Sequence, residues 1–122
     1  MDPVTGGLSD PFPAGTMHGD MVSVLPPDAT LLGIGTVYRN QAFRVSATSW
    51  GVQFHPEIDL DAYVSWVDAE PDAPAENRQR LLDGRAEFAA CENQVRAGNE
   101  QLMRNFVQVV KAVSPVLQLD GC

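Results

Sequence analysis

The chain has 122 residues, with 16 acidic against 8 basic side chains and a formal net charge of −8 at pH 7. This length suits one domain, and the 44% of apolar residues predicts a packed core and excludes a disordered chain. The acidic charge disfavours nucleic acid and anionic membranes as partners, and no apolar run reaches the roughly 20 residues of a transmembrane helix, so we expect a soluble cytoplasmic protein.

The character of the sequence changes near Glu70. Residues 1–57 contain seven of the ten glycines and six of the nine prolines, whereas residues 75–113 contain no proline and only two glycines. Because glycine and proline interrupt regular elements, we predict strands and loops first and helix afterwards. We accordingly divide the chain into a domain part, 1–70, and a helical C-terminal extension, 71–122, that packs on it.

The first part is predicted to hold a small set of strands. Residues 2–15 carry too many prolines and glycines for a regular element and are expected to form a surface loop that ends in a short strand at residues 16–18. A strand is expected within residues 29–38. Residues 41–45 alternate polar and apolar side chains, and residues 50–55 form a second β-like run, so the two are predicted to pair as a hairpin.

The second part is predicted to be helical. Asp59 is a candidate N-cap for a short helix at residues 60–67, with Leu60, Val64 and Val67 on one face. Beyond it, apolar side chains recur at helical spacing along one stripe: Leu81, Phe88, Cys91, Val95, Leu102, Phe106, Val109 and Val113. This stripe predicts one long helix or two nearly collinear helices that cover the sheet.

Two histidines each precede a carboxylate by two positions: His18 before Asp20, and His55 before Glu57. Three interpretations follow. The four side chains could hold a divalent metal, His55 and Glu57 could act as a general base and its orienting acid, or each His could be structural. Pro56 turns the backbone after a predicted strand end, which lets Glu57 fold back onto His55, so the geometry favours the acid–base pair over the metal.

A longer pattern surrounds these residues. Four short motifs occur in order: His18-Gly19-Asp20, Val24-Leu25-Pro26 with Ala29 and Leu31-Leu32, Gln41-Ala42-Phe43-Arg44, and Trp50-Gly51-Val52-Gln53-Phe54-His55-Pro56-Glu57. In this order and spacing they resemble the C-terminal half of class I, triad-type glutamine amidotransferase domains, including the amidotransferase part of GMP synthases. The close match covers about a third of the chain and leaves residues 75–122 without a recognised motif.

The resemblance implies both a fold and a chemistry. The expected fold is α/β, a partial three-layer, flavodoxin-like amidotransferase domain with a long C-terminal helical segment. In that family a cysteine attacks the side-chain amide of glutamine, and ammonia passes to an acceptor. By position, His55 would act as the base and general acid, and Glu57 would orient His55. The main chain at His18 and Gly19 would bind the amino-acid end of glutamine. Asp20 would brace that loop.

The family nucleophile has no counterpart in this chain. The resemblance implies a Gly-x-Cys-x-Gly turn upstream of the four motifs, and no such turn occurs. Cys91 lies on the apolar stripe and is predicted to be buried and inert, and Cys122 is the last residue. Two cysteines also provide neither a disulfide framework nor a four-cysteine zinc site. We therefore expect no glutaminase activity from the chain alone.

Three explanations for the missing half stay open: a truncated gene product, a non-catalytic binding or assembly protein, or a half-domain completed by another polypeptide. An incomplete sheet would leave an exposed edge, so we expect self-association, or poor solubility that the net charge of −8 partly offsets. The expected partners are glutamine, if a nucleophile-bearing half completes the site, and a second copy or a synthase subunit. We expect no cofactor and no resident metal.

Overall fold

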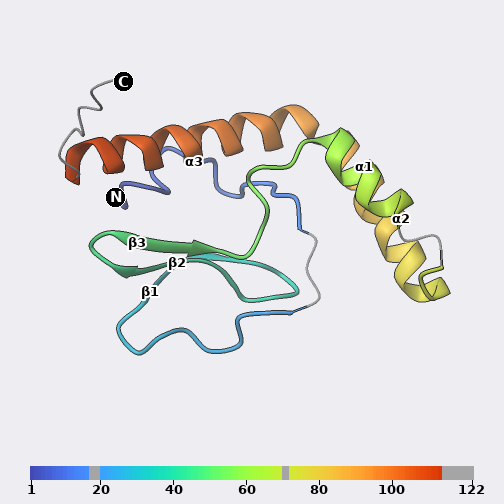
Figure 1. The fold of residues 1–122 in the computed structure, drawn as a ribbon, viewed down its shortest axis with the longest axis horizontal. Helices are drawn as coiled ribbons and strands as arrows, with labels where there is room; N and C mark the ends of the chain where they lie inside the picture. Colours follow the sequence, from blue (N-terminus) through green and yellow to red (C-terminus); the bar gives the residue numbers. More distant parts are fainter. Residues whose placement is uncertain (17–19, 70–71, 114–122) are drawn as a thin grey trace, which may run out of the picture.

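The computed structural model of the chain describes residues 1–16, 20–69 and 72–113. Its elements follow in the order β1 (Thr30–Ile34), β2 (Asn40–Ser46), β3 (Ser49–Val52), α1 (Leu60–Asp68), α2 (Ala75–Ala90) and α3 (Glu92–Val113). Figure 1 shows α3 running above the sheet, with α1 and α2 together at one end of it. The fold is therefore mixed α and β, as predicted.

The sheet has three antiparallel strands in the order β1-β2-β3. The predicted hairpin is confirmed as β2 and β3, which pair with Arg44 opposite Trp50 and Ala42 opposite Val52. The prediction that this strand continues to His55 is wrong, because β3 ends at Val52. After one further bond, from the Gln53 N–H to the Gln41 carbonyl (2.8 Å), the chain turns Phe54 into the core, where it is 7% exposed.

The segment 2–15 lacks helix and strand, as predicted; Pro3, Gly7 and residues 9–11 are exposed, but part of the segment is buried. It lies between α3 and the sheet (Figure 1), with Val4 4% exposed and Gly15 buried. From α3, the Asn105 side-chain amide donates to the carbonyls of Val4 (2.8 Å) and Gly6 (2.7 Å). These bonds satisfy main-chain groups that an irregular buried segment would otherwise leave unpaired.

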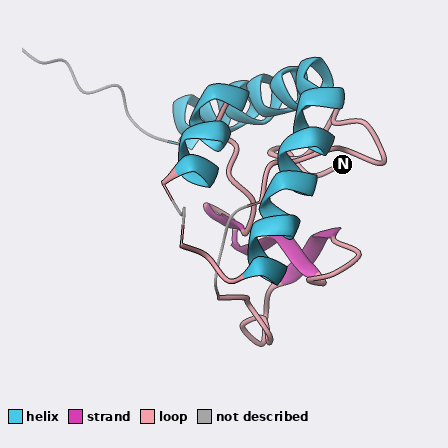
Figure 2. Cartoon of the chain, turned by 90° about the vertical axis from the view of Figure 1, so that its right-hand side faces the viewer, coloured by secondary structure: helices cyan, strands magenta, loops and turns pink. Residues whose placement is uncertain are grey.

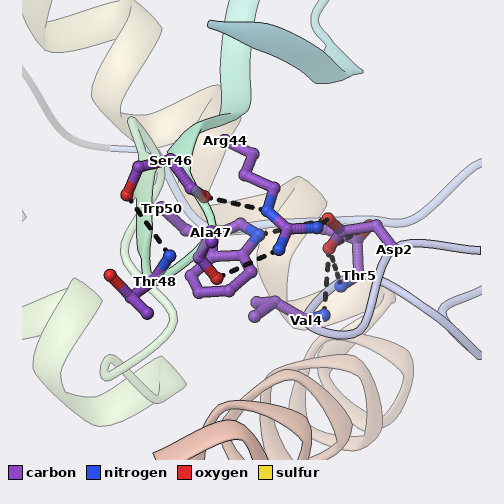
Figure 3. Close-up of polar contacts among 8 residues, drawn as sticks. All are labelled: Asp2, Val4, Thr5, Arg44, Ser46, Ala47, Thr48 and Trp50. Carbon is purple, nitrogen blue, oxygen red and sulfur yellow. Dashed lines mark hydrogen bonds and ion pairs between the residues drawn. The ribbon is translucent and has the colours of Figure 1, made fainter. Parts of the chain in front are cut away.

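Asp2 fastens this segment to the sheet (Figure 3). One carboxylate oxygen accepts the N–H groups of Val4 (2.9 Å) and Thr5 (3.0 Å), and the other accepts the indole N–H of Trp50 (3.2 Å) and lies 3.6 Å from the Arg44 guanidinium. Arg44 also stacks over the Trp50 ring at 4.6 Å. Burial raises the pKa of Asp2, but the donated hydrogen bonds outweigh it and hold the pKa below the usual 3.8.

Helix α1 begins as predicted. The Asp59 side chain accepts the Ala62 N–H at 2.8 Å, which caps the first turn. The buried face differs from the expected one, because Tyr63 and Val67 are buried while Val64 is only part-buried. Tyr63 stacks on Phe88 of α2 at 5.3 Å, and a Cβ at Gly84 would lie 2.3 Å from the Tyr63 hydroxyl, so the two helices approach closely at a glycine.

The C-terminal helical region consists of two helices that meet at Cys91. Cys91 ends α2 with φ −123°, and its N–H bonds to the Phe88 carbonyl three residues back, while its own carbonyl accepts the Val95 N–H of α3. Figures 1 and 2 show α2 turning away from the axis of α3 at this point. The prediction of nearly collinear helices is therefore wrong.

Two hydrophobic clusters form the core. The first, cluster 1, joins α1, α2 and the start of α3 through Ile58, Tyr63, Val67, Phe88 and Val95. The second, cluster 2, joins the N-terminal segment, the sheet and α3 through Val4, Ala42, Phe54 and Leu102. Most of the predicted stripe faces these clusters, but Phe106 (41%) and Val113 (56%) are exposed.

In the described part of the chain, no helix is both long enough and apolar enough to span a membrane.

Candidate functional site

The candidate site lies on the loop between β3 and α1, which presents His55 and Glu57. The main chain of this loop is fixed just before and just after the two residues. The His55 N–H donates to the Gly15 carbonyl at 2.9 Å, and Ile58, 6% exposed, inserts into cluster 1 directly after Glu57. The loop is therefore fixed by the N-terminal segment on one side and by the helical core on the other.

His55 and Glu57 are in direct contact. The Nδ1 atom of His55 lies 2.5 Å from Oε1 of Glu57, as the two-residue spacing across Pro56 predicts. The imidazole is 30% exposed and the carboxylate 61% exposed. A carboxylate held against one ring nitrogen of a histidine is also the arrangement found where an orienting acid supports a general base.

The contact with His55 lowers the pKa of the Glu57 carboxyl group. Desolvation raises its pKa, but the hydrogen bond with His55, a bond from its own main-chain N–H and the charge of His55 together outweigh desolvation and hold the pKa below 4.5. Glu57 is therefore ionised at neutral pH. The stabilisation that ionised Glu57 contributes through this contact is complete above the pKa of Glu57 in the unfolded chain. It is lost as the pH falls through the lower pKa of the folded chain.

Trp66 of α1 sets the orientation of the imidazole. The two rings meet edge to face at 5.1 Å between centroids and an interplanar angle of 79°. Trp66 also packs against cluster 1, so it connects the imidazole to the helical core. Edge-to-face contacts of this kind are typical of packed aromatic side chains.

The predicted substrate-binding residues, His18 and Gly19, lie outside the described residues, so the structure does not place them relative to His55. The same applies to the metal interpretation, which requires His18. Among the residues that are described, no group of three or more His, Cys, Asp or Glu side chains is arranged to hold a metal ion.

Cys91 differs from its prediction. It is part-buried instead of buried, and its thiol donates to the Glu87 carbonyl at 3.1 Å. It lies at the junction of α2 and α3 and packs against cluster 1, so its present contacts are structural. Cys122 lies outside the described residues.

Several residues of the family-like motifs have contacts that build the fold. Arg44 and Trp50 bind Asp2, and the Gln53 side chain accepts the Val22 N–H at 2.9 Å. Gly15 is the site-forming residue that sequence reasoning missed. Its carbonyl holds the His55 main chain, and a Cβ there would lie 2.7 Å from Phe88. In the sequence it is one glycine among several in an irregular segment, which gives no such signal.

Comparison of the chain with protein-family models, with curated proteins and with solved structures found no match.

Proposed function

We propose that this chain is the His- and Glu-bearing part of a class I, triad-type glutamine amidotransferase domain of flavodoxin-like fold. The observation that carries the proposal is the 2.5 Å contact between His55 Nδ1 and Glu57 Oε1, made by the two residues that the motif resemblance selects. The lowered pKa of Glu57 supports the same role, because it keeps an ionised carboxylate against the imidazole.

The proposed chemistry needs a thiolate from a second segment or polypeptide. The thiolate attacks the side-chain amide carbon of glutamine, and the imidazolium of His55 protonates the departing ammonia. Water, deprotonated by His55, then hydrolyses the thioester to glutamate and regenerates the thiol. Main chain at His18 and Gly19 is proposed to bind the amino-acid end of glutamine.

The test supplies the missing part. The full chain is joined to a segment that carries a strand and a Gly-x-Cys-x-Gly turn, and ammonia release from glutamine is measured. We expect activity in the joined protein. His55→Ala is expected to lower kcat by about 100-fold or more, the usual contribution of a general base, and Glu57→Gln to lower it less. Asp61→Asn, an exposed carboxylate on α1, is the matched control and should change nothing.

A joined protein that folds yet releases no ammonia would remove the catalytic proposal. So would a His55→Ala variant with unchanged kcat.

A second candidate function, assembly without catalysis, is favoured by the C-terminal half of α3. Five large apolar side chains there are 41–56% exposed and form an exposed stripe: Met103, Phe106, Val107, Val110 and Val113. If a second copy packs antiparallel with the two-fold axis between Phe106 and Val107, Met103 of one copy lies opposite Val110 of the other, and the apolar stripes cover each other. The occupant proposed for this stripe is therefore a second copy of the chain.

Sedimentation equilibrium tests this candidate. We expect a concentration-dependent dimer that Val107→Glu abolishes, because the new carboxylate would be buried in the interface. Asn93→Glu adds the same charge at an exposed position near the start of α3, ten residues before Met103, and should leave the dimer intact. A wild-type chain that stays monomeric at 0.5 mM would contradict self-assembly.

A further inference from the structure

Phe12 of the N-terminal segment contacts both helix α3 and the residue that precedes His55. Its ring meets the ring of Phe54 edge to face, with the centroids 5.6 Å apart and an interplanar angle of 71°. The same ring lies against Gly98 of α3, where a Cβ atom would overlap it. Phe12 therefore connects α3 to the start of the loop that carries His55 and Glu57.

The main chain around His55 is held from two different clusters. On the near side, Phe54 is 7% exposed in cluster 2, Phe12 packs against that cluster, and the Gly15 carbonyl accepts the His55 N–H at 2.9 Å. On the far side, Ile58 is buried in cluster 1 directly after Glu57. The position of His55 thus depends on the N-terminal segment, whereas Glu57 is fixed from the helical core.

A displacement of Phe54 reaches His55 through the backbone. The planar peptide unit between the two residues keeps their Cα atoms at a fixed separation of about 3.8 Å, so a shift of the first moves the second. A buried ring that loses its packing partner relaxes into the space left behind. Without the Phe12 ring, we expect His55 to move while Glu57 keeps its place, and their 2.5 Å contact depends on both.

We infer that Phe12 is a positioning residue for the pair: its ring holds Phe54 and, through Phe54, keeps the His55 imidazole at its contact distance from Glu57. This geometry is independent of the amidotransferase proposal. Its consequence for proton transfer by His55 rests on that proposed function.

NMR of the full chain at a fixed pH tests the inference through two signals of His55. The nitrogen chemical shift of Nδ1 reports the contact with Glu57, and it describes the folded state, so a loss of overall stability alone does not move it. Hydrogen exchange of the His55 N–H reports its bond to Gly15. The reference is the Val95 N–H, which donates to the Cys91 carbonyl at 3.0 Å in the helical core.

Phe12→Leu keeps most of the apolar volume and removes the ring, so the variant should fold. We expect the Nδ1 shift to move toward its value in Glu57→Gln, in which the carboxylate is absent. The His55 N–H should exchange about three- to tenfold faster relative to the Val95 N–H, the range that corresponds to one aromatic pair contact.

Val4→Ala is the matched control, because Val4 is a buried apolar residue of the same segment and is 4% exposed. It should accelerate exchange of the His55 and Val95 N–H groups by the same factor and leave the Nδ1 shift unchanged.

Gly98→Ala perturbs Phe12 from the side of α3. It should move both His55 signals in the same direction as Phe12→Leu, and it should have no effect on them in a Phe12→Ala background, where the overlap with the ring is gone.

The inference is overturned if a folded Phe12→Leu variant keeps the wild-type Nδ1 shift and exchange ratio, or if Val4→Ala changes both signals as much. Equal effects of Gly98→Ala with and without the Phe12 ring would also overturn it. None of these measurements uses glutamine or a nucleophile, so their failure leaves the test by ammonia release standing, and failure of that test leaves this one standing.

Discussion

A single side chain, that of Asp2, makes several of the contacts that hold the N-terminal segment on the sheet. Its carboxylate is 9% exposed and faces the Trp50 indole and the Arg44 guanidinium, two residues that the sequence pattern had associated with the functional motif. The contacts give Arg44 and Trp50 a structural role. Because Asp2 is titratable, these contacts also make the free energy of unfolding depend on pH.

Asp2→Asn is expected to lower the free energy of unfolding at pH 7 by about 1–2 kcal/mol, because an amide nitrogen would replace the oxygen that accepts from Trp50. The folded pKa of Asp2 lies below 3.8, so its stabilisation is complete above the unfolded pKa and is lost as the pH falls through the folded value. The difference between wild type and variant should therefore shrink between pH 5 and pH 2 in urea titrations.

The exposed Asp28→Asn variant is the control and should unfold like wild type at each pH. A difference at Asp2 that stayed constant down to pH 2 would contradict the linkage.

The contact between His55 and Glu57 was accessible from sequence, because two residues on either side of a proline have few ways to separate. The partners that fix the pair were not. Gly15 and Trp66 come from distant segments of the chain. Spacing along the chain carries no information on such contacts.

At the scale of elements, alternation and capping gave the β2–β3 hairpin and the start of α1 correctly, but not the end of β3 or the buried face of α1. Alternating side chains predict a half-buried strand, and the Asp59 cap follows from a local hydrogen bond, so both depend on neighbours in sequence. The break at Cys91 does not. The apolar repeat keeps its phase through that residue, so the periodicity could not reveal that α2 turns to pack on α1.

Helix α3 shows a second limit of periodicity. Its inner face is buried at Val95 and Leu102, whereas Phe106 and Val113 are exposed although they follow the same spacing. A helical pattern identifies an apolar sector but not how far along the helix a covering layer extends.

Gly98 allows Phe12 of the N-terminal segment to lie against α3, since a Cβ there would be 2.0 Å from the Phe12 ring. Alanine normally stabilises a helix interior by about 1 kcal/mol relative to glycine. Here we expect Gly98→Ala to destabilise the chain by about 1–3 kcal/mol through overpacking.

A double-mutant cycle tests this cause. In a Phe12→Ala background the clash is gone, so Gly98→Ala should become neutral or stabilising there. Equal losses in both backgrounds would mean that Phe12 is not responsible.

At the scale of the molecule, the two clusters share their supporting elements. Helix α3 contributes Val95 to cluster 1 and Leu102 to cluster 2, and the N-terminal segment reaches both through Gly15 and Phe12. Each cluster also has one tryptophan packed against it, Trp66 at cluster 1 and Trp50 at cluster 2. The predicted division at residue 70 runs through both clusters, since each includes side chains from either side of it.

We expect the two clusters to unfold together. In Trp50→Phe and Trp66→Phe variants, the fluorescence of the remaining tryptophan should give the same urea midpoint as far-UV circular dichroism of the same variant. Separate midpoints within one variant would show that the clusters are independent units.

The glycine at position 15 couples the imidazole to the corner of the two long helices. Its carbonyl holds the main chain of His55, and the missing side chain is the space into which Phe88 fits, one helical turn before Cys91. A change in the angle between α2 and α3 would therefore move Phe88 against this glycine and shift the main chain that carries the imidazole. The bend at Cys91 and the position of His55 are thus connected through a single residue.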